Sequence, residues 1–238
     1  MSKAQQYFNQ EHQQVRDSVS RFVEREILPF VDAWEEAEEF PRELYLKAGA
    51  AGILGIGYPE KFGGSYEGDL FAKVAASEEL MRSGSGGLVA GLGSLDIGLP
   101  PVLKWAKPAV RDRVVPQVVA GEKIIALAVT EPSGGSDVAG LKTRAVRDGD
   151  FYRVTGSKTF ITSGVRADYY TVAVRTGGDG FAGVSLLLIE KGTPGFSVGR
   201  SLKKMGWWAS DTAELFFDDC KVPVENLIGV ENMGFAGI

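Results

Sequence analysis

The spacing of apolar residues changes near residue 122, and this change constrains the fold more than any other feature. Upstream, apolar residues recur at the spacing of amphipathic helices. Downstream, they form the short runs and alternations that are typical of strands. The 238 residues are enough for two domains, each with its own core. We therefore predict a helical domain at residues 1–122 and a β domain at residues 123–230, with a further helical element starting at 231–238.

Three helices in the first half have recognisable first turns. Asn9 and Asp69 are suited to cap helices, and Pro108 is tolerated in a first helical turn. Pro29 ends the first of these helices. The apolar residues at helical spacing are Val15, Val19, Phe22, Val23 and Ile27 in the first helix, Leu70, Val74 and Met81 in the second, and Val110, Val114 and Val118 in the third.

The second half contains several short β-rich runs separated by turns. These runs are Lys123–Thr130, Leu141–Val146, Phe151–Thr155, Tyr169–Arg175, Val184–Glu190 and Ala213–Phe217. Asp148-Gly149, between the second and third runs, is a strong hairpin signal. Short strands at this density predict an antiparallel barrel or sandwich.

Composition and charge exclude several classes of function. The chain has 26 Lys and Arg residues and 31 Asp and Glu residues, which gives a net charge of -5, and it has no basic run. No nucleic-acid partner is therefore expected. The single cysteine, Cys220, allows no intrachain disulfide and no cysteine metal cluster, and we expect a structural thiol. The single histidine, His12, is expected on a solvated surface, and no metal site is predicted.

Signals for membrane insertion or export are not recognised. We expect no stretch to reach the roughly 18 apolar residues that a membrane span needs. The first residues, Met1–Gln6, are polar and contain no signal-peptide core. These features predict a cytoplasmic protein without a membrane span.

Glycine is over-represented, with 31 residues. Several glycines lie in an apolar helix candidate at residues 84–99, which indicates that something packs close to the helix axis. Gly178–Gly183 matches the G-x-G-x-x-G pattern of dinucleotide-binding sites. The residues that follow, 184–189, are strand-like rather than helical, so we interpret this segment as a hairpin loop.

Two segments at strand ends contain the groups that could bind a ligand. Thr130-Glu131-Pro132-Ser133-Gly134-Gly135-Ser136-Asp137 follows a strand and offers consecutive backbone N–H groups and hydroxyls. Gly156-Ser157-Lys158-Thr159-Phe160-Ile161-Thr162-Ser163-Gly164 ends another strand with an aromatic residue and a threonine. From the residues alone, ordinary turns of a β domain are the favoured interpretation, and a planar cofactor between the two segments is the alternative.

Four ordered motifs resemble the acyl-CoA dehydrogenase family. They are Thr130-Glu131-Pro132-x-x-Gly135-Ser136-Asp137, Gly156-x-Lys158-x-x-Ile161-Thr162-x-Gly164, Met205-Gly206-x-x-x-Ser210-Asp211-Thr212 and Val222-Pro223-x-Glu225-Asn226-x-x-Gly229. The resemblance runs from the N-terminus to the last residue. It implies an N-terminal all-α domain followed by an antiparallel β-barrel domain, with this chain ending before the C-terminal helical bundle of the family.

The resemblance also implies that the two segments hold the isoalloxazine ring of FAD. The residues expected on one side of the flavin are Leu127, Val129, Thr130, Gly135 and Ser136, and those on the other side are Phe160, Ile161 and Thr162. The Thr162 hydroxyl would lie near flavin N5, and backbone N–H groups around Val129 and Thr130 would meet the pyrimidine edge. Leu127 and Phe160 stand where family members often have an aromatic residue and a tryptophan.

The activity implied is FAD-dependent α,β-dehydrogenation of an acyl-CoA to a trans-2-enoyl-CoA, with electrons passed to an electron-transfer flavoprotein by a homotetramer. Ser136 would contact the thioester or pantetheine arm. Gly93, with Gly91, would either border the acyl tail or serve helix packing. The carboxylate base is expected beyond Ile238, and neither Glu131 nor Glu225 is assigned to it. The alternatives are an acyl-CoA or nitroalkane oxidase that uses O₂, or a non-catalytic fragment that binds flavin or acyl groups.

Overall fold

The computed structural model of this chain describes residues 7–238, so the expectation for Met1–Gln6 lies outside the described residues. The chain forms two compact units. The helical unit contains the residues up to Gly93 together with Val119–Glu122 and Lys204–Ser210. The sheet unit contains Ser94–Val118, Lys123–Lys203 and Asp211–Ile238. Helices from the first half of the chain therefore contribute to the sheet unit, and a loop from the second half contributes to the helical unit.

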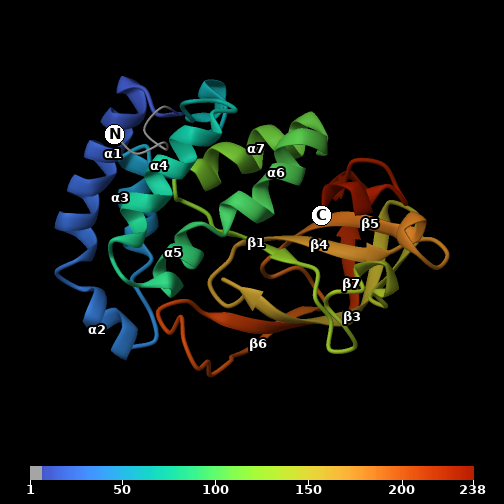
Figure 1. Cartoon of the computed structure of the whole chain (residues 1–238). Helices are drawn as coiled ribbons and strands as arrows, with labels where there is room; N and C mark the ends of the chain where they lie inside the picture. The colour runs from blue at the N-terminus through green and yellow to red at the C-terminus, as the bar shows by residue number, and fades with distance from the viewer. Residues whose placement is uncertain (1–6) are drawn as a thin grey trace. The chain divides into compact units, whose positions relative to one another are not determined.

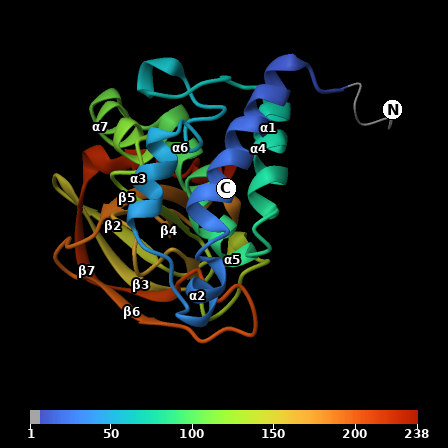
Figure 2. The same ribbon diagram turned by 90° about the vertical axis from the view of Figure 1, so that its left-hand side faces the viewer.

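Five helices make up most of the helical unit. They are α1 (Gln10–Phe22), α2 (Val31–Glu36), α3 (Glu43–Ala50), α4 (Leu70–Met81) and α5 (Gly86–Leu92). The Asn9 side chain accepts a hydrogen bond from the backbone N–H of His12, which confirms the predicted start of α1. A π-helical turn, Val23–Ile27, extends α1 toward Pro29. Figure 2 shows α1 and α4 lying side by side, and the two helices are in contact along their length.

Helix α4 begins as predicted but buries a different set of residues. Asp69 caps it by accepting hydrogen bonds from the N–H groups of Phe71 and Ala72. The residues that α4 buries are Ala72, Ala75 and Ala76. Leu70 and Met81 are exposed, because the small alanine face allows α1 to approach closely. The spacing of the largest apolar residues therefore does not identify the buried face of this helix.

Eight strands form one sheet in the sheet unit. They are β1 (Ile125–Ala128), β2 (Arg144–Asp148), β3 (Phe151–Thr162), β4 (Tyr169–Arg175), β5 (Val184–Glu190), β6 (Phe196–Ser201), β7 (Thr212–Pro223) and β8 (Leu227–Ile228). Their order is β6-β7-β3-β2-β4-β5-β8, and β1 pairs with β4. Figure 1 shows β1 next to β4. The predicted β2–β3 hairpin is confirmed, and β4 and β5 pair in antiparallel fashion around the glycine-rich loop, as the hairpin interpretation requires.

The sheet is not purely antiparallel. β1 pairs with β4 in parallel, and β2 joins β4 through one parallel pair. The β2–β3 hairpin separates β1 from β4 in sequence, and this long connection permits the parallel arrangement. The fold class predicted from the sequence, a helical domain followed by a sheet domain, is confirmed with this difference.

Helices α6 (Leu95–Trp105) and α7 (Pro108–Val119) belong to the sheet unit, apart from the last residue of α7. Helix α6 packs on β1 and β4: a Cβ on Gly98 would lie 3.1 Å from the backbone of Ala126. The Thr171 hydroxyl donates to the Gly98 carbonyl at 2.7 Å. The predicted start of α7 at Pro108 is confirmed, and Val110, Val114 and Val118 are buried. A glycine is needed at position 98 because the helix lies directly against the strand.

One stretch, Gly86–Trp105, is long and apolar enough to cross a membrane by length and composition, contrary to the expectation for this chain. Its most apolar window is 56% buried in the structure. It also contains two helices, α5 and α6, with Gly93 and Ser94 between them. Burial of this extent is equally typical of helices in a protein core, so the stretch is no more than weak evidence for a span.

Candidate functional site

The two segments singled out from the sequence meet in the sheet unit. The backbone N–H of Thr159 donates to the carbonyl of Thr130 at 2.9 Å. One residue earlier in β3, the Lys158 ammonium donates to the carbonyl of Val129 at 2.9 Å. Both contacts lie where β1 runs into the loop that begins at Thr130. The structure therefore joins the first two motifs into a single site.

The loop after β1 turns sharply and leaves its backbone accessible. Glu131 and Gly134 exchange two backbone hydrogen bonds of 3.0 Å, which closes a turn. Gly135 and Ser136 follow this turn and are exposed. A Cβ on Gly135 would lie 3.2 Å from the Thr130 methyl group, so a side chain there would crowd Thr130. The loop offers backbone groups and the Ser136 hydroxyl without a bulky side chain over them.

Leu127 and Val129 lie on one face of this segment. Ala126 and Ala128, which alternate with them, are fully buried, whereas Leu127 and Val129 are half-buried. Leu127 lines a cavity of about 370 Å³ with Ile97, Pro101 and Trp105 of α6. The residues of this segment that the resemblance assigns to a cofactor therefore lie on its accessible face, beside apolar residues of α6 and the charged Asp96 and Lys104.

Strand β3 contains a bulge between Lys158 and Ile161. These residues pair with Leu215 and Ala213 of β7, so β3 has an extra residue in the interval. Phe160 adopts a φ of 58°, which an aromatic residue rarely adopts, and its side chain is 68% exposed. The bulge turns this aromatic ring out of the sheet, and strain of this kind often gathers at binding sites.

Ile161 and Thr162 differ in accessibility. The Ile161 side chain is buried in the sheet unit, so this residue can offer a ligand only its backbone. Thr162 is half-buried, and its backbone pairs with Thr212 of β7. Of the three residues that the resemblance places on this side of a flavin, only Phe160 and Thr162 have accessible side chains.

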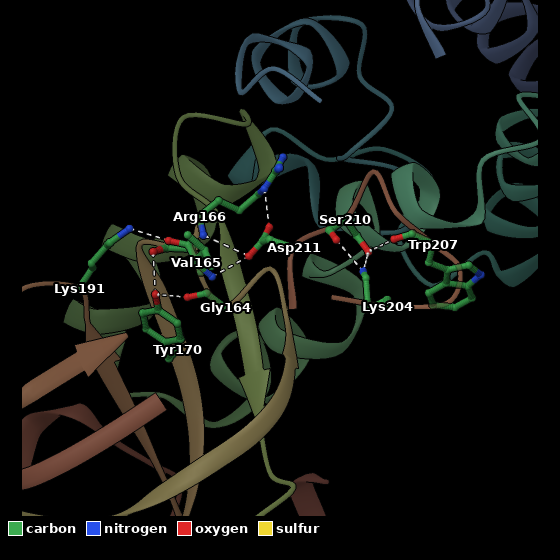
Figure 3. A network of polar contacts seen from close by, with 10 residues as sticks. Gly164, Val165, Arg166, Tyr170, Lys191, Lys204, Trp207, Ser210 and Asp211 are labelled. Carbon is green, nitrogen blue, oxygen red and sulfur yellow. Dashed lines mark hydrogen bonds and ion pairs between the residues drawn. The ribbon is translucent and has the colours of Figure 1, made fainter. Parts of the chain in front are cut away.

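The turn after Thr162 is fixed by Asp211, as Figure 3 shows. The Asp211 carboxylate accepts hydrogen bonds from the Val165 N–H and from the Arg166 guanidinium, both at 2.6 Å. Its backbone carbonyl accepts the N–H of Ser163 at 3.0 Å. The third motif therefore supports the end of β3, because Asp211 stabilises the turn that follows Thr162.

The remainder of the third motif belongs to the helical unit. There the Lys204 ammonium donates to the carbonyl and hydroxyl of Ser210, both at 2.6 Å, and the Ser210 hydroxyl donates to the Trp207 carbonyl (Figure 3). A Cβ on Gly86 or Gly87 would lie within 3 Å of Trp207. The glycines at the start of α5 thus allow the Trp207 loop to pack directly on the helix.

A buried ion pair beside Val129 was not recognised in the sequence. Lys158 and Glu131 lie 2.9 Å apart, with side-chain exposures of 0% and 4%. Burial lowers the pKa of Lys158 to about 8, against the opposing hydrogen bond and charge of Glu131. Burial raises the pKa of Glu131, but hydrogen bonds from Thr143 and Lys158 outweigh it and leave that pKa below its usual value. Both residues lie inside the first two motifs. A charged residue in a β-rich segment was the available signal that this pair is buried.

The glycine helix candidate is interrupted, and its glycines have different neighbours. A Cβ on Gly91 would lie 2.8 Å from the Phe40 ring, so Gly91 serves close packing within the helical unit. A Cβ on Gly93 would meet only the Val89 carbonyl, at 3.0 Å. Gly93 ends α5 and belongs to the helical unit, whereas the residues predicted to bind the flavin belong to the sheet unit.

Other candidate residues are held in structural roles. Cys220 is fully buried in β7, as predicted, and burial raises the pKa of its thiol to about 11. Glu225 is exposed in a short turn, Val224–Asn226. Among residues 7–238, no group of three or more His, Cys, Asp and Glu side chains lies close enough to hold a metal ion.

The site fits a flat ring with a polar edge. The Gly134–Ser136 backbone has no side chain that would cover it, and the bulge exposes the aromatic ring of Phe160. The Thr162 hydroxyl and the backbone donors near Val129 and Thr130 supply polar partners, and Leu127 supplies an apolar side chain. A flat ring with a polar edge, such as isoalloxazine, uses groups of these kinds.

Comparison with known proteins identifies the family of this chain. The family model described as "Acyl-CoA dehydrogenase, N-terminal domain" matches residues 9–122, and "Acyl-CoA dehydrogenase, middle domain" matches residues 126–220. The rat mitochondrial long-chain specific acyl-CoA dehydrogenase is 42% identical over 96% of this chain and 53% of its own length.

Solved structures give the same result. A candidate acyl-CoA dehydrogenase from Mycobacterium smegmatis has a TM-score of 0.94 and 51% identity, over 97% of this chain and 61% of its own. The FAD complex of PigA has a TM-score of 0.92 and 30% identity over the same 97% and 61%. The chain thus spans between half and two thirds of the proteins it matches. It belongs to the acyl-CoA dehydrogenase family, of which it carries the N-terminal and middle domains.

Proposed function

We propose that the complete protein is an FAD-dependent acyl-CoA dehydrogenase that converts an acyl-CoA to the trans-2-enoyl-CoA and passes electrons to an electron-transfer flavoprotein. The observation that carries this proposal is the junction of the two motifs, through the 2.9 Å hydrogen bonds from Thr159 to Thr130 and from Lys158 to Val129. The names of the relatives support the reaction class. Assembly as a homotetramer and a cytoplasmic location are part of the proposal.

The residues of this chain would bind and orient the reactants. When bound, FAD supplies the acceptor for the hydride that leaves the substrate β carbon. Thr162 would donate its hydroxyl near flavin N5, Phe160 and Leu127 would exclude water from the ring, and Ser136 would contact the thioester arm. Donors that face a site of developing negative charge favour the transition state.

Neither candidate carboxylate in the motifs is placed to act as the base. Glu131 accepts hydrogen bonds from the backbone of Lys142 and Thr143 and from Lys158, so its oxygens are engaged inside the sheet unit. Glu225 is exposed in a turn between β7 and β8. We infer that the carboxylate that removes the α proton lies beyond Ile238.

An anaerobic titration of the complete protein tests this function. Reconstitution with FAD should give the flavin absorbance, and a set of saturated acyl-CoAs should bleach it. Thr162→Val should lower the rate of bleaching more than the FAD content. Thr155→Val, at an exposed position of the same strand, should change neither. Unchanged rates for Thr162→Val would contradict the role of that residue.

The same titration separates the alternative functions. Rapid reoxidation in air with ligand bound would favour an acyl-CoA or nitroalkane oxidase that uses O₂. FAD binding without bleaching by any acyl-CoA would favour a non-catalytic binding protein. A stable reduced flavin that is reoxidised by an electron-transfer flavoprotein is the result expected here.

A further inference from the structure

Lys158 is the most deeply buried charged side chain near the candidate site. Its side chain is 0% exposed, and its ammonium has two partners, Glu131 and the Val129 carbonyl, each at 2.9 Å. Removing two charges from water costs free energy of desolvation. Replacing such a pair with apolar residues therefore often leaves the stability of the fold unchanged or increases it. A role in stability alone is therefore a weak explanation for this pair.

The contact with Val129 fixes the orientation of one peptide group. The described chain contains no cis peptide bond, so the N–H of Thr130 points opposite to the Val129 carbonyl. Because that carbonyl faces Lys158, the Thr130 N–H faces away from the ion pair. The half-buried Val129 and Thr130 lie at the accessible end of β1, where the proposed flavin edge would be.

The other end of the pair is held rigidly. The Glu131 carboxylate accepts the N–H groups of Lys142 at 2.6 Å and Thr143 at 2.8 Å. Thr143 in turn packs against Gly156 of β3, where a Cβ would lie 2.7 Å from the Thr143 Cα. Glu131 therefore holds the Lys158 ammonium against the Val129 carbonyl from a fixed frame.

A cation bound to a carbonyl also polarises the peptide group. Hydrogen bonds in series strengthen one another, so an ammonium on the Val129 oxygen makes the Thr130 N–H a stronger donor. A stronger donor binds an anion more tightly than a neutral acceptor. The reduced flavin of such a site carries more negative charge than the oxidised flavin, so this donor discriminates between the two.

We propose that Lys158, held by Glu131, is a positioning residue that orients and polarises the Val129–Thr130 peptide toward the flavin and so favours binding of the reduced flavin. This inference rests on the proposed function, because it assumes that FAD binds between the two motifs. Lys158 acts through the peptide and does not itself contact the cofactor.

The test compares oxidised and reduced FAD binding in the complete protein. Lys158→Met should weaken binding of reduced FAD about tenfold more than binding of oxidised FAD. For a two-electron couple, this tenfold change corresponds to a midpoint potential about 30 mV lower. Lys142→Met is the matched control, because its exposed side chain can be removed while its backbone still donates to Glu131. The control should leave the potential unchanged.

Lys158→Met leaves Glu131 buried without its partner, so the double variant Lys158→Met/Glu131→Gln is measured beside it. The double variant should fold, bind oxidised FAD and show the same lowered potential. An unchanged potential in a folded, FAD-loaded double variant would overturn the inference, as would failure of both variants to fold, which would assign the pair to folding itself. Failure of the unmodified protein to bind FAD would instead overturn the proposed function, and this inference with it.

Discussion

Nε2 of His12 lies 2.8 Å from Oδ2 of Asp69, and this pair joins the first turns of α1 and α4. Nδ1 of His12 accepts the backbone N–H of Asn9 at 3.0 Å, so Nε2 carries the proton that is donated to Asp69. The expectation of a solvated surface histidine was wrong, because the side chain is buried against α4. One carboxylate thus caps its own helix and binds a histidine of its neighbour.

Asp69→Ala should lower the free energy of unfolding by about 1–2 kcal/mol, because it removes a helix cap and leaves His12 without this partner. Urea unfolding measures the change. Asp17→Ala removes an exposed carboxylate from α1 and is the control. Equal losses for the two variants would contradict the role of the pair.

Phe160→Gly should weaken FAD binding with little effect on the stability of the fold. Glycine adopts a φ of 58° without strain, so the free energy of unfolding should change by less than about 1 kcal/mol. FAD affinity should fall, because an exposed aromatic wall is lost. Phe160→Trp should retain affinity. Unchanged FAD affinity in the glycine variant would remove Phe160 from the site.

Gly156→Ala should destabilise the sheet unit. The new Cβ would lie 2.7 Å from the Cα of Thr143, and Gly156 has a φ of 149°. Overpacking of this kind typically costs about 1–3 kcal/mol. Gly134→Ala, where nothing lies within 4 Å of the added atom, should be close to neutral. Thermal unfolding of both variants checks the difference.

Glu131 should contribute to loss of stability in acid. Its pKa in the folded chain lies below the usual 4.5, so its stabilising contribution is present above about pH 4.5 and is lost as the pH falls through the folded value. Glu131→Gln should therefore flatten the dependence of unfolding free energy on pH below 4.5. Urea unfolding between pH 3 and pH 7 measures the slope. Glu225→Gln, at an exposed carboxylate, should not flatten it to the same extent.

Gly91 and Gly93 should respond differently to substitution. Gly91→Ala should cost stability, since its Cβ would lie 2.8 Å from Phe40. Gly93→Glu in the complete protein should shift activity toward shorter acyl chains, because a carboxylate against a hydrocarbon tail is costly. An unchanged chain-length profile in a folded Gly93→Glu variant would favour the packing interpretation for Gly93 as well.

The predictable features of this fold depend on local signals. Strands β4 and β5 match the predicted Tyr169–Arg175 and Val184–Glu190 because nearly every residue in them is buried and apolar. Strand β6 was not predicted, because its half-exposed residues, Phe196–Ser201, have no apolar run. The parallel pairing of β1 with β4 depends on contacts between distant segments, which local periodicity does not encode.

The candidate site was predictable in its location and not in its geometry. Motif order placed the two segments together, and the hydrogen bond from Thr159 to Thr130 confirms that they meet. The bulge that exposes Phe160 while burying Ile161 arises from the pairing of β3 with β7, which alternation alone does not indicate. Roles for Ser136 and Thr162 in binding, and the domain boundary at residue 122, stay predictions.

The Trp207 loop sets a constraint on how the chain folds during its synthesis. The helical unit takes Lys204–Ser210 as part of its structure, and the glycines of α5 receive Trp207. At the elongation rates of ribosomes, residue 210 emerges on the order of ten seconds after residue 93. Throughout that interval the start of α5 lacks its contact with Trp207, so the helical unit can be completed only after most of the sheet sequence has been translated.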